Sequence, residues 1–119
     1  MTAHRALGDI GKAFDGPAVT QATSITTGVT CQGTSGKITT VSQTVAAAAE
    51  ATFVVTNSVV KTNSVVLVTM VTNNGTGTFL AFVTDIQSGQ FSVTVANLHA
   101  SAAGNNTLVL RFLVLETQT

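Results

Sequence analysis

The side chains that could do chemistry are few in this sequence, and they lie far apart. The only cysteine is Cys31, and the only histidines are His4 and His99. A catalytic thiol needs a neighbouring base, and a zinc site needs three or four ligands, so this set alone predicts neither. We expect Cys31 to be a buried, inert side chain and His99 to be an ordinary loop residue.

The carboxylates show no spacing that is typical of a general acid and base. They are scattered along the chain, at Asp9, Asp15, Glu50, Asp85 and Glu116. Residues 33–39, GTSGKIT, resemble a phosphate-binding loop, but the pattern needs glycine where Cys31 stands and Ser or Thr where Ile38 stands. A turn that leads into a strand accounts for these glycines better. We therefore predict no enzymatic activity, no catalytic or metal-binding residues and no cofactor.

The charge of the chain is low and balanced. Five Lys and Arg oppose five Asp and Glu, and charged residues make up 8% of the chain, against about 25% in an ordinary domain. Nucleic-acid binding needs clustered Lys and Arg, which the sequence lacks. It also lacks the run of about 20 apolar residues that a membrane helix needs, and residues 1–16 do not resemble a signal peptide. We expect a protein made in the cytoplasm that binds neither nucleic acid nor membrane.

Beyond Pro17 the hydrophobic pattern has the period of two that is typical of β-strands. It recurs in residues 36–43, 51–57, 64–73, 78–86, 89–97 and 107–115, which are rich in Val, Ile and Thr. Residues 107–115 alternate most clearly, with Leu108, Leu110, Phe112 and Val114 on one face and Val109, Arg111, Leu113 and Leu115 on the other. In residues 78–86, the same alternation places Ile86 on the face of Leu80 and Phe82.

Turn residues separate these segments. Gly and Asn in residues 73–77, 87–90 and 103–106 are suited to positive backbone angles, and Ser88-Gly89 is typical of a tight hairpin. Strands at this spacing predict an all-β fold, an antiparallel β-sandwich or jelly-roll-like domain. We expect one such domain over residues 18–119, preceded by a short N-terminal arm over residues 1–17.

A near-repeat, TNSVVK followed by TNSVVL, spans residues 56–67. A fibrous solenoid needs at least about three repeats, and no third copy follows. We therefore interpret residues 53–60 as the end of one strand, residues 61–63 as the link and residues 64–73 as the next strand.

The N-terminal arm has an apolar face of its own if it is helical. Leu7, Ile10 and Phe14 are spaced i, i+3 and i+7, which places them on one side of a helix. Gly8 and Gly11 disfavour an isolated helix. Two interpretations stay open: a frayed tail, or an arm that docks these three side chains on a neighbouring subunit.

Several strands are apolar on both faces, and a two-layer sandwich buries only one face of each sheet. Val109, Leu113 and Leu115 are therefore candidates for contact with a partner. Burying about 400 Å² of such surface would contribute on the order of 10 kcal/mol before the costs of association. We expect a homo-oligomer. The alternative is a monomer coated with Thr, Ser and Asn.

Five segments taken in order resemble a family of small β-rich virion proteins of tailed bacteriophages. They are TQATS…TGVT (20–30), SGKITT (35–40), AEATFVVTNS (49–58), GQFSVTVANL (89–98) and the apolar strand 107–115. The resemblance covers roughly residues 19–115, and the arm lies outside it. It offers no catalytic motif to carry over.

The resemblance implies a capsid decoration, or cement, protein that stabilises the head by binding between major capsid subunits. It would be located in the virion, on the capsid surface, after assembly in the host cytoplasm, and we expect a trimer. A tail-fibre or receptor-binding module of the virion is the alternative. A cellular sugar-binding β-domain is a third interpretation, which the absence of Trp and Tyr disfavours.

Overall fold

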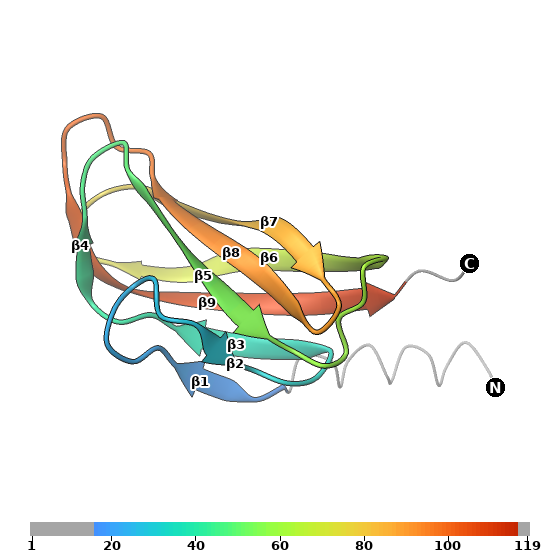
Figure 1. Cartoon of the computed structure of the whole chain (residues 1–119). Coiled ribbons are helices and arrows are strands. Elements are labelled where there is room, and N and C mark those ends of the chain that lie inside the picture. The colour runs from blue at the N-terminus through green and yellow to red at the C-terminus, as the bar shows by residue number, and fades with distance from the viewer. Residues whose placement is uncertain (1–15, 117–119) are drawn as a thin grey trace, which may run out of the picture.

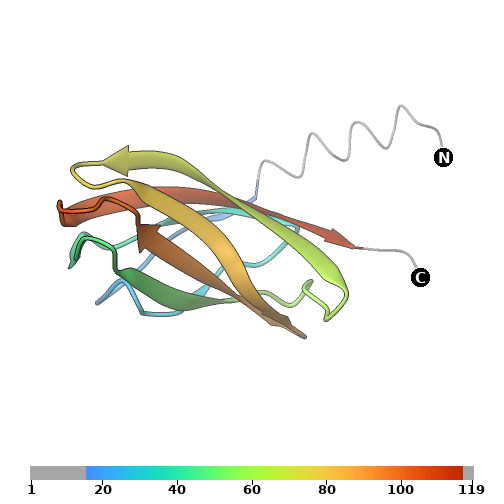
Figure 2. The same ribbon diagram turned by 90° about the horizontal axis from the view of Figure 1, so that it is seen from above.

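The computed structural model describes residues 16–116, and within them the chain forms strands and turns. Leu7, Ile10 and Phe14 lie outside the described residues. The strands are β1 (Ala18–Thr20), β2 (Val29–Thr30), β3 (Ser35–Thr39), β4 (Gln43–Val45), β5 (Glu50–Thr56), β6 (Ser64–Asn74), β7 (Phe79–Gln87), β8 (Gln90–Asn97) and β9 (Gly104–Glu116). Figures 1 and 2 show them in two layers that face each other.

One layer is a five-stranded sheet built around β9. Strand β6 pairs with one edge of β9, β3 and β4 pair with other parts of it, and β1 pairs with β3. The other layer is a four-stranded sheet in the order β2-β5-β8-β7. The fold is therefore all-β and sandwich-like, as predicted. The two short pairs, β1 with β3 and β2 with β5, are parallel, and the remaining pairs are antiparallel.

The connections from β5 onward pass between the layers, as in a jelly roll. Strands β5, β7 and β8 belong to the four-stranded sheet, whereas β6 and β9 belong to the five-stranded one. Only the link from β7 to β8 stays within a sheet. It is the two-residue hairpin predicted at Ser88-Gly89, and Gly89 has a φ of 87°, which favours glycine.

The core between the layers is made by alternate residues of the long strands. In β9 the predicted set Leu108, Leu110, Phe112 and Val114 is buried. Phe91 of β8 meets Phe112 edge to face, with ring centroids 5.2 Å apart, the arrangement that aromatic quadrupoles favour. The period of two thus fixes which side of β9 faces the core and which side faces outward.

Strand β7 departs from the predicted alternation. Its pairing with β8 shifts between Val83 and Asp85, so one extra residue is accommodated by a β-bulge. The bulge reverses the faces that follow it. Ile86 therefore packs against the core together with Phe79 and Val83, and the prediction that it shares a face with Leu80 is wrong.

The turn predicted at residues 103–106 is also misplaced. Strand β9 already begins at Gly104 and pairs with β4 there, so the turn lies before it. Gly104 is buried beside the ring of Phe79, which leaves no room for a Cβ atom. The glycine marks a close packing contact, which local sequence does not distinguish from a turn. The turn predicted at 73–77 is confirmed, with positive φ at Gly75 and Gly77.

The two copies of the near-repeat adopt different structures. Strand β5 ends at Thr56, so residues 57–60 belong to the link to β6. The prediction that the strand extends to residue 60 is therefore wrong. The side-chain nitrogen of Asn57 donates to the carbonyls of Cys31 (2.9 Å) and Gly33 (2.7 Å), and its side-chain oxygen accepts from the Val59 N–H (2.9 Å). Asn57 is fully buried, whereas Asn63, at the same place in the second copy, is exposed.

Candidate functional site

The most distinctive surface of the described chain is the outer face of the five-stranded sheet along β6 and β9. Val65 lies opposite Leu115, and Leu67 lies opposite Leu113. Leu67 is 53% exposed, Leu115 45% and Val65 42%, and Leu113 is half-buried. We call these four side chains the apolar outer face. Because they alternate with core residues in both strands, they cannot turn inward without a shift in register.

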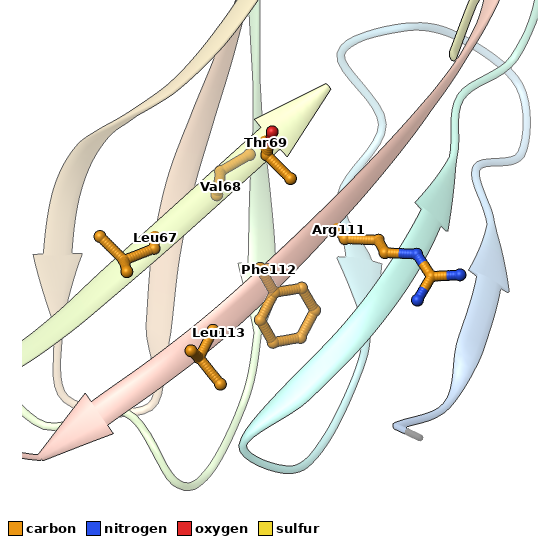
Figure 3. Close-up of a pocket in the computed structure, with 6 residues that line it drawn as sticks. All are labelled: Leu67, Val68, Thr69, Arg111, Phe112 and Leu113. Carbon is orange, nitrogen blue, oxygen red and sulfur yellow. The ribbon is translucent and has the colours of Figure 1, made fainter. Parts of the chain in front are cut away.

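A hollow of about 350 Å³ lies at this part of β6 and β9. It is lined by Leu67, Val68, Thr69, Arg111, Phe112 and Leu113. Figure 3 shows the two leucines on neighbouring strands at one end of the hollow and Arg111 at the other, with its guanidinium group directed toward β3. The lining offers apolar surface and few polar groups, so it suits an apolar side chain better than a polar ligand.

Two cations border the apolar outer face. Lys37 of β3 lies directly opposite Arg111 of β9 and both are exposed. Like charges that face each other across a sheet repel. The carboxylates whose side chains the structure describes, Glu50 and Asp85, belong to the other sheet, in β5 and β7. A partner that brings a carboxylate to this place would relieve the repulsion.

The residues predicted for partner contact are only partly brought together. Leu113 and Leu115 both belong to the apolar outer face. Val109 also points outward and is half-buried, but Arg111 separates it from Leu113 along β9. Leu7, Ile10 and Phe14 lie outside the described residues, so their role stays a prediction.

Sequence reasoning missed Val65, Leu67 and the pair of cations. Residues 65–70 read as a nearly continuous apolar run, which does not indicate which side chains face outward. Lys37 and Arg111 are 74 positions apart in the sequence, and only the pairing of β3 with β9 brings them together. The alternation within each strand could be predicted from the sequence, whereas the pairing of one strand with another could not.

The outer face of the four-stranded sheet is polar by comparison. Thr52 and Thr94 share a hydrogen bond of 2.7 Å between their hydroxyl groups, and Thr84 lies 3.3 Å from the Thr94 hydroxyl. The large exposed apolar side chain of this face is Leu80, which is 49% exposed. It therefore serves as a reference for Leu67, which has similar exposure on the opposite sheet.

The described thiol and imidazole groups, which could in principle take part in catalysis, have structural roles. Cys31 is 1% exposed, and burial raises the pKa of its thiol above the ordinary value, although a hydrogen bond from the backbone of Lys37 acts in the opposite direction. The Nδ1 atom of His99 accepts the N–H groups of Ser101 and Ala102, which closes its own loop. Among the described residues, no group of three His, Cys, Asp or Glu side chains could hold a metal ion.

Comparisons with protein-family models, with curated proteins and with solved structures found no match. Within residues 16–116 there is also no helix of the length and apolar character needed to cross a membrane. The apolar outer face is therefore the feature of this chain that points most directly to a function.

Proposed function

We propose that this protein is a structural subunit of a bacteriophage virion, a capsid decoration protein that binds between major capsid subunits and stabilises the head. The proposal combines the sequence resemblance to small β-rich virion proteins with a surface suited to assembly. It includes association of the chain with itself, as a trimer. No catalytic step, metal or cofactor is part of it.

The observation that carries this proposal is the apolar outer face. Val65, Leu67 and Leu115 are each more than 40% exposed and lie side by side in two paired strands. Clustered side chains of this kind mark contact surfaces more often than isolated exposed ones. Charged residues make up 8% of the chain, so little electrostatic repulsion opposes association.

A rigid sandwich that associates with its own copies through one apolar face could stabilise a capsid by mass action, because the associated copies bind several capsid subunits at once. A subunit that binds the assembled shell, and not its separated parts, shifts the equilibrium toward the shell. Repetition over many lattice sites multiplies the effect, because each bound copy holds its neighbours together. The long hydrogen-bonded pairing of β6 with β9 presents the apolar face on a stiff support.

Counting the protein in purified particles tests this role. Quantitative mass spectrometry should find on the order of hundreds of copies per particle, as repeated binding over a head lattice requires. A few dozen copies or fewer would indicate a tail component instead. Absence from the particle would refute a virion role altogether.

A matched pair of substitutions tests the surface. Leu67→Asp places a charge on the apolar outer face and should break the association between copies on which repeated binding depends, so we expect it to reduce the amount bound to particles about tenfold or more. Leu80→Asp makes the same change at a side chain of similar exposure on the opposite sheet and should leave binding unchanged. Equal loss in both variants would show that binding does not depend on the apolar outer face.

A further inference from the structure

The described residues leave the apolar outer face open, and the chain carries a segment with the chemistry to cover it. Residues 1–15 include Leu7, Ile10 and Phe14 at helical spacing, together with Asp9 and Asp15. Leu67 is 53% exposed, so the described residues do not cover it. A second copy of the chain can supply the cover, because it carries the same three apolar side chains.

The segment starts from the border of this same sheet. At Gly16 a Cβ atom would overlap the backbone of Ser35, so the chain is pressed against β3 there. The carbonyl of Pro17 then accepts the N–H of Lys37 at 2.9 Å. Ser35 lies opposite Leu113, and Leu113 lies opposite Leu67. The place where residues 1–15 join the described chain is therefore level with Leu113 and Leu67 of the apolar outer face across the paired strands.

We propose that the apolar outer face receives residues 1–15 of a second copy of this chain, which packs Leu7, Ile10 and Phe14 over Leu67 and Leu113. This inference rests on the proposed function for its place in the virion, and it identifies the partner at the same surface. Fifteen residues span about 22 Å as a helix and about 50 Å when extended, enough to reach a neighbouring subunit.

Two charges of the segment can complement the border of the face. Lys37 and Arg111 stand opposite each other, and the described part of the sheet offers them no carboxylate. The incoming segment carries Asp9 and Asp15, together with Arg5 and Lys12, so these side chains bring no net charge. Docking therefore gains from charge only where it places Asp9 or Asp15, and not Arg5 or Lys12, near the two cations.

The proposed contact also determines how copies associate. The donating segment and the receiving face are different parts of the chain, so each copy gives to one neighbour and receives from another. A head-to-tail contact of this kind closes into a ring when the rotation between copies permits it. A ring of three is the trimer proposed above, and it leaves no apolar outer face uncovered.

Two variants with complementary defects test whether residues 1–15 of one copy dock on the apolar outer face of another. One lacks residues 2–15 and keeps the face. The other, Leu67→Asp/Leu113→Asp, keeps the segment and loses the face. By native mass spectrometry each variant alone should be a monomer, and an equimolar mixture should form a complex of one copy of each and nothing larger. A truncated variant that still assembles as the full chain does, or a mixture that forms no complex, would overturn the proposal.

Thiol labelling gives a second readout that does not depend on the folding of the double variant. In a Cys31→Ala background, Leu67→Cys should react with a maleimide about tenfold more slowly in the full chain than in the chain without residues 2–15. Dilution of the full chain should remove the difference. Leu80→Cys should react at the same rate in both chains. Equal rates at position 67, or protection that persists on dilution, would contradict docking from a second copy.

These measurements use the purified protein alone. A failure of segment docking therefore leaves the particle counts, which test the virion role, unaffected. Conversely, docking in solution would stand even if the protein were absent from particles.

Discussion

Buried amide side chains hold the loops of this sandwich in place. Asn57 satisfies two carbonyls and one N–H at one point. Asn97 donates to the carbonyls of Val45 and Ala102 and accepts the N–H groups of Thr78 and His99. Buried backbone groups need partners. The amides supply them where the strands stop, so these residues have structural explanations and need no ligand.

Asn57→Ala should destabilise the fold by roughly 3 kcal/mol, because the buried Cys31 carbonyl and the partly buried Gly33 carbonyl and Val59 N–H lose their partner. Asn63→Ala changes the equivalent residue of the second repeat copy, which is exposed, and should cost less than about 1 kcal/mol. Urea unfolding followed by circular dichroism measures both. Similar losses in the two variants would show that the buried hydrogen bonds contribute little.

The Cys31 thiol should respond to pH as a buried neutral group does. Its pKa is raised in the folded state, so its contribution to stability is complete below the ordinary pKa of a thiol. That contribution is lost as the pH rises through the folded-state pKa. The free energy of unfolding should therefore fall over this range more in the natural chain than in Cys31→Ala. Parallel pH profiles of the free energy of unfolding for the two chains would contradict a raised pKa of Cys31 in the folded state.

At the scale of the elements, the close packing of β3 against the core beside β9 requires a residue without a side chain at position 36. A Cβ atom at Gly36 would lie 2.5 Å from both the Cys31 sulfur and a carbon of the Phe112 ring. Only glycine allows this approach without displacing core side chains. The glycine that resembled part of a phosphate loop is thus explained by packing.

Gly36→Ala should destabilise the protein by about 1–3 kcal/mol, because it overpacks the space between Cys31 and Phe112. The loss should be smaller in a Cys31→Ala background, since the smaller side chain frees part of that space. Gly28→Ala is the comparison with a milder contact, because its Cβ would lie 3.2 Å from the Val54 carbonyl oxygen, which a shift of a few tenths of an ångström relieves, and its loss should be smaller. Thermal unfolding compares the variants. A purely additive effect of Gly36→Ala and Cys31→Ala would argue against direct contact.

The elements differ in how far local pattern could predict them. Strand β9 was predicted face by face, because its period of two is unbroken from Leu108 to Val114. Strand β7 was predicted as a strand, but the side of the sheet on which Ile86 lies was predicted wrongly. A bulge after Val83 adds one residue that the hydrophobic pattern does not reveal. Half of the apolar outer face, Leu113 and Leu115, followed from β9. The other half required the register with β6, which is a property of the folded chain.

For the whole molecule, we propose a sandwich whose apolar outer face is covered by other copies of the same chain. Folding and association then become linked, because a contact that exists only between folded chains stabilises the folded state by mass action. The arrangement accounts for strands that are apolar on both faces in a chain with few charges. It also gives the three apolar side chains of the arm a binding site.

The midpoint of thermal unfolding should therefore rise with protein concentration in the natural chain. In Leu67→Asp it should be independent of concentration, because the contact is weakened by a charge in an apolar site. Leu80→Asp, on the other sheet, should retain the dependence. Scanning calorimetry at several concentrations compares all three. A natural chain whose midpoint does not change would contradict the link between folding and association.

The most direct test of the central claim is the mass of the purified, full-length protein in solution, measured by light scattering at micromolar concentration. If the apolar outer face is an assembly contact, the mass will be a multiple of 12.1 kDa, and Leu67→Asp will reduce it to that of one chain. A natural chain that stays at the mass of one subunit over the whole concentration range would contradict the account.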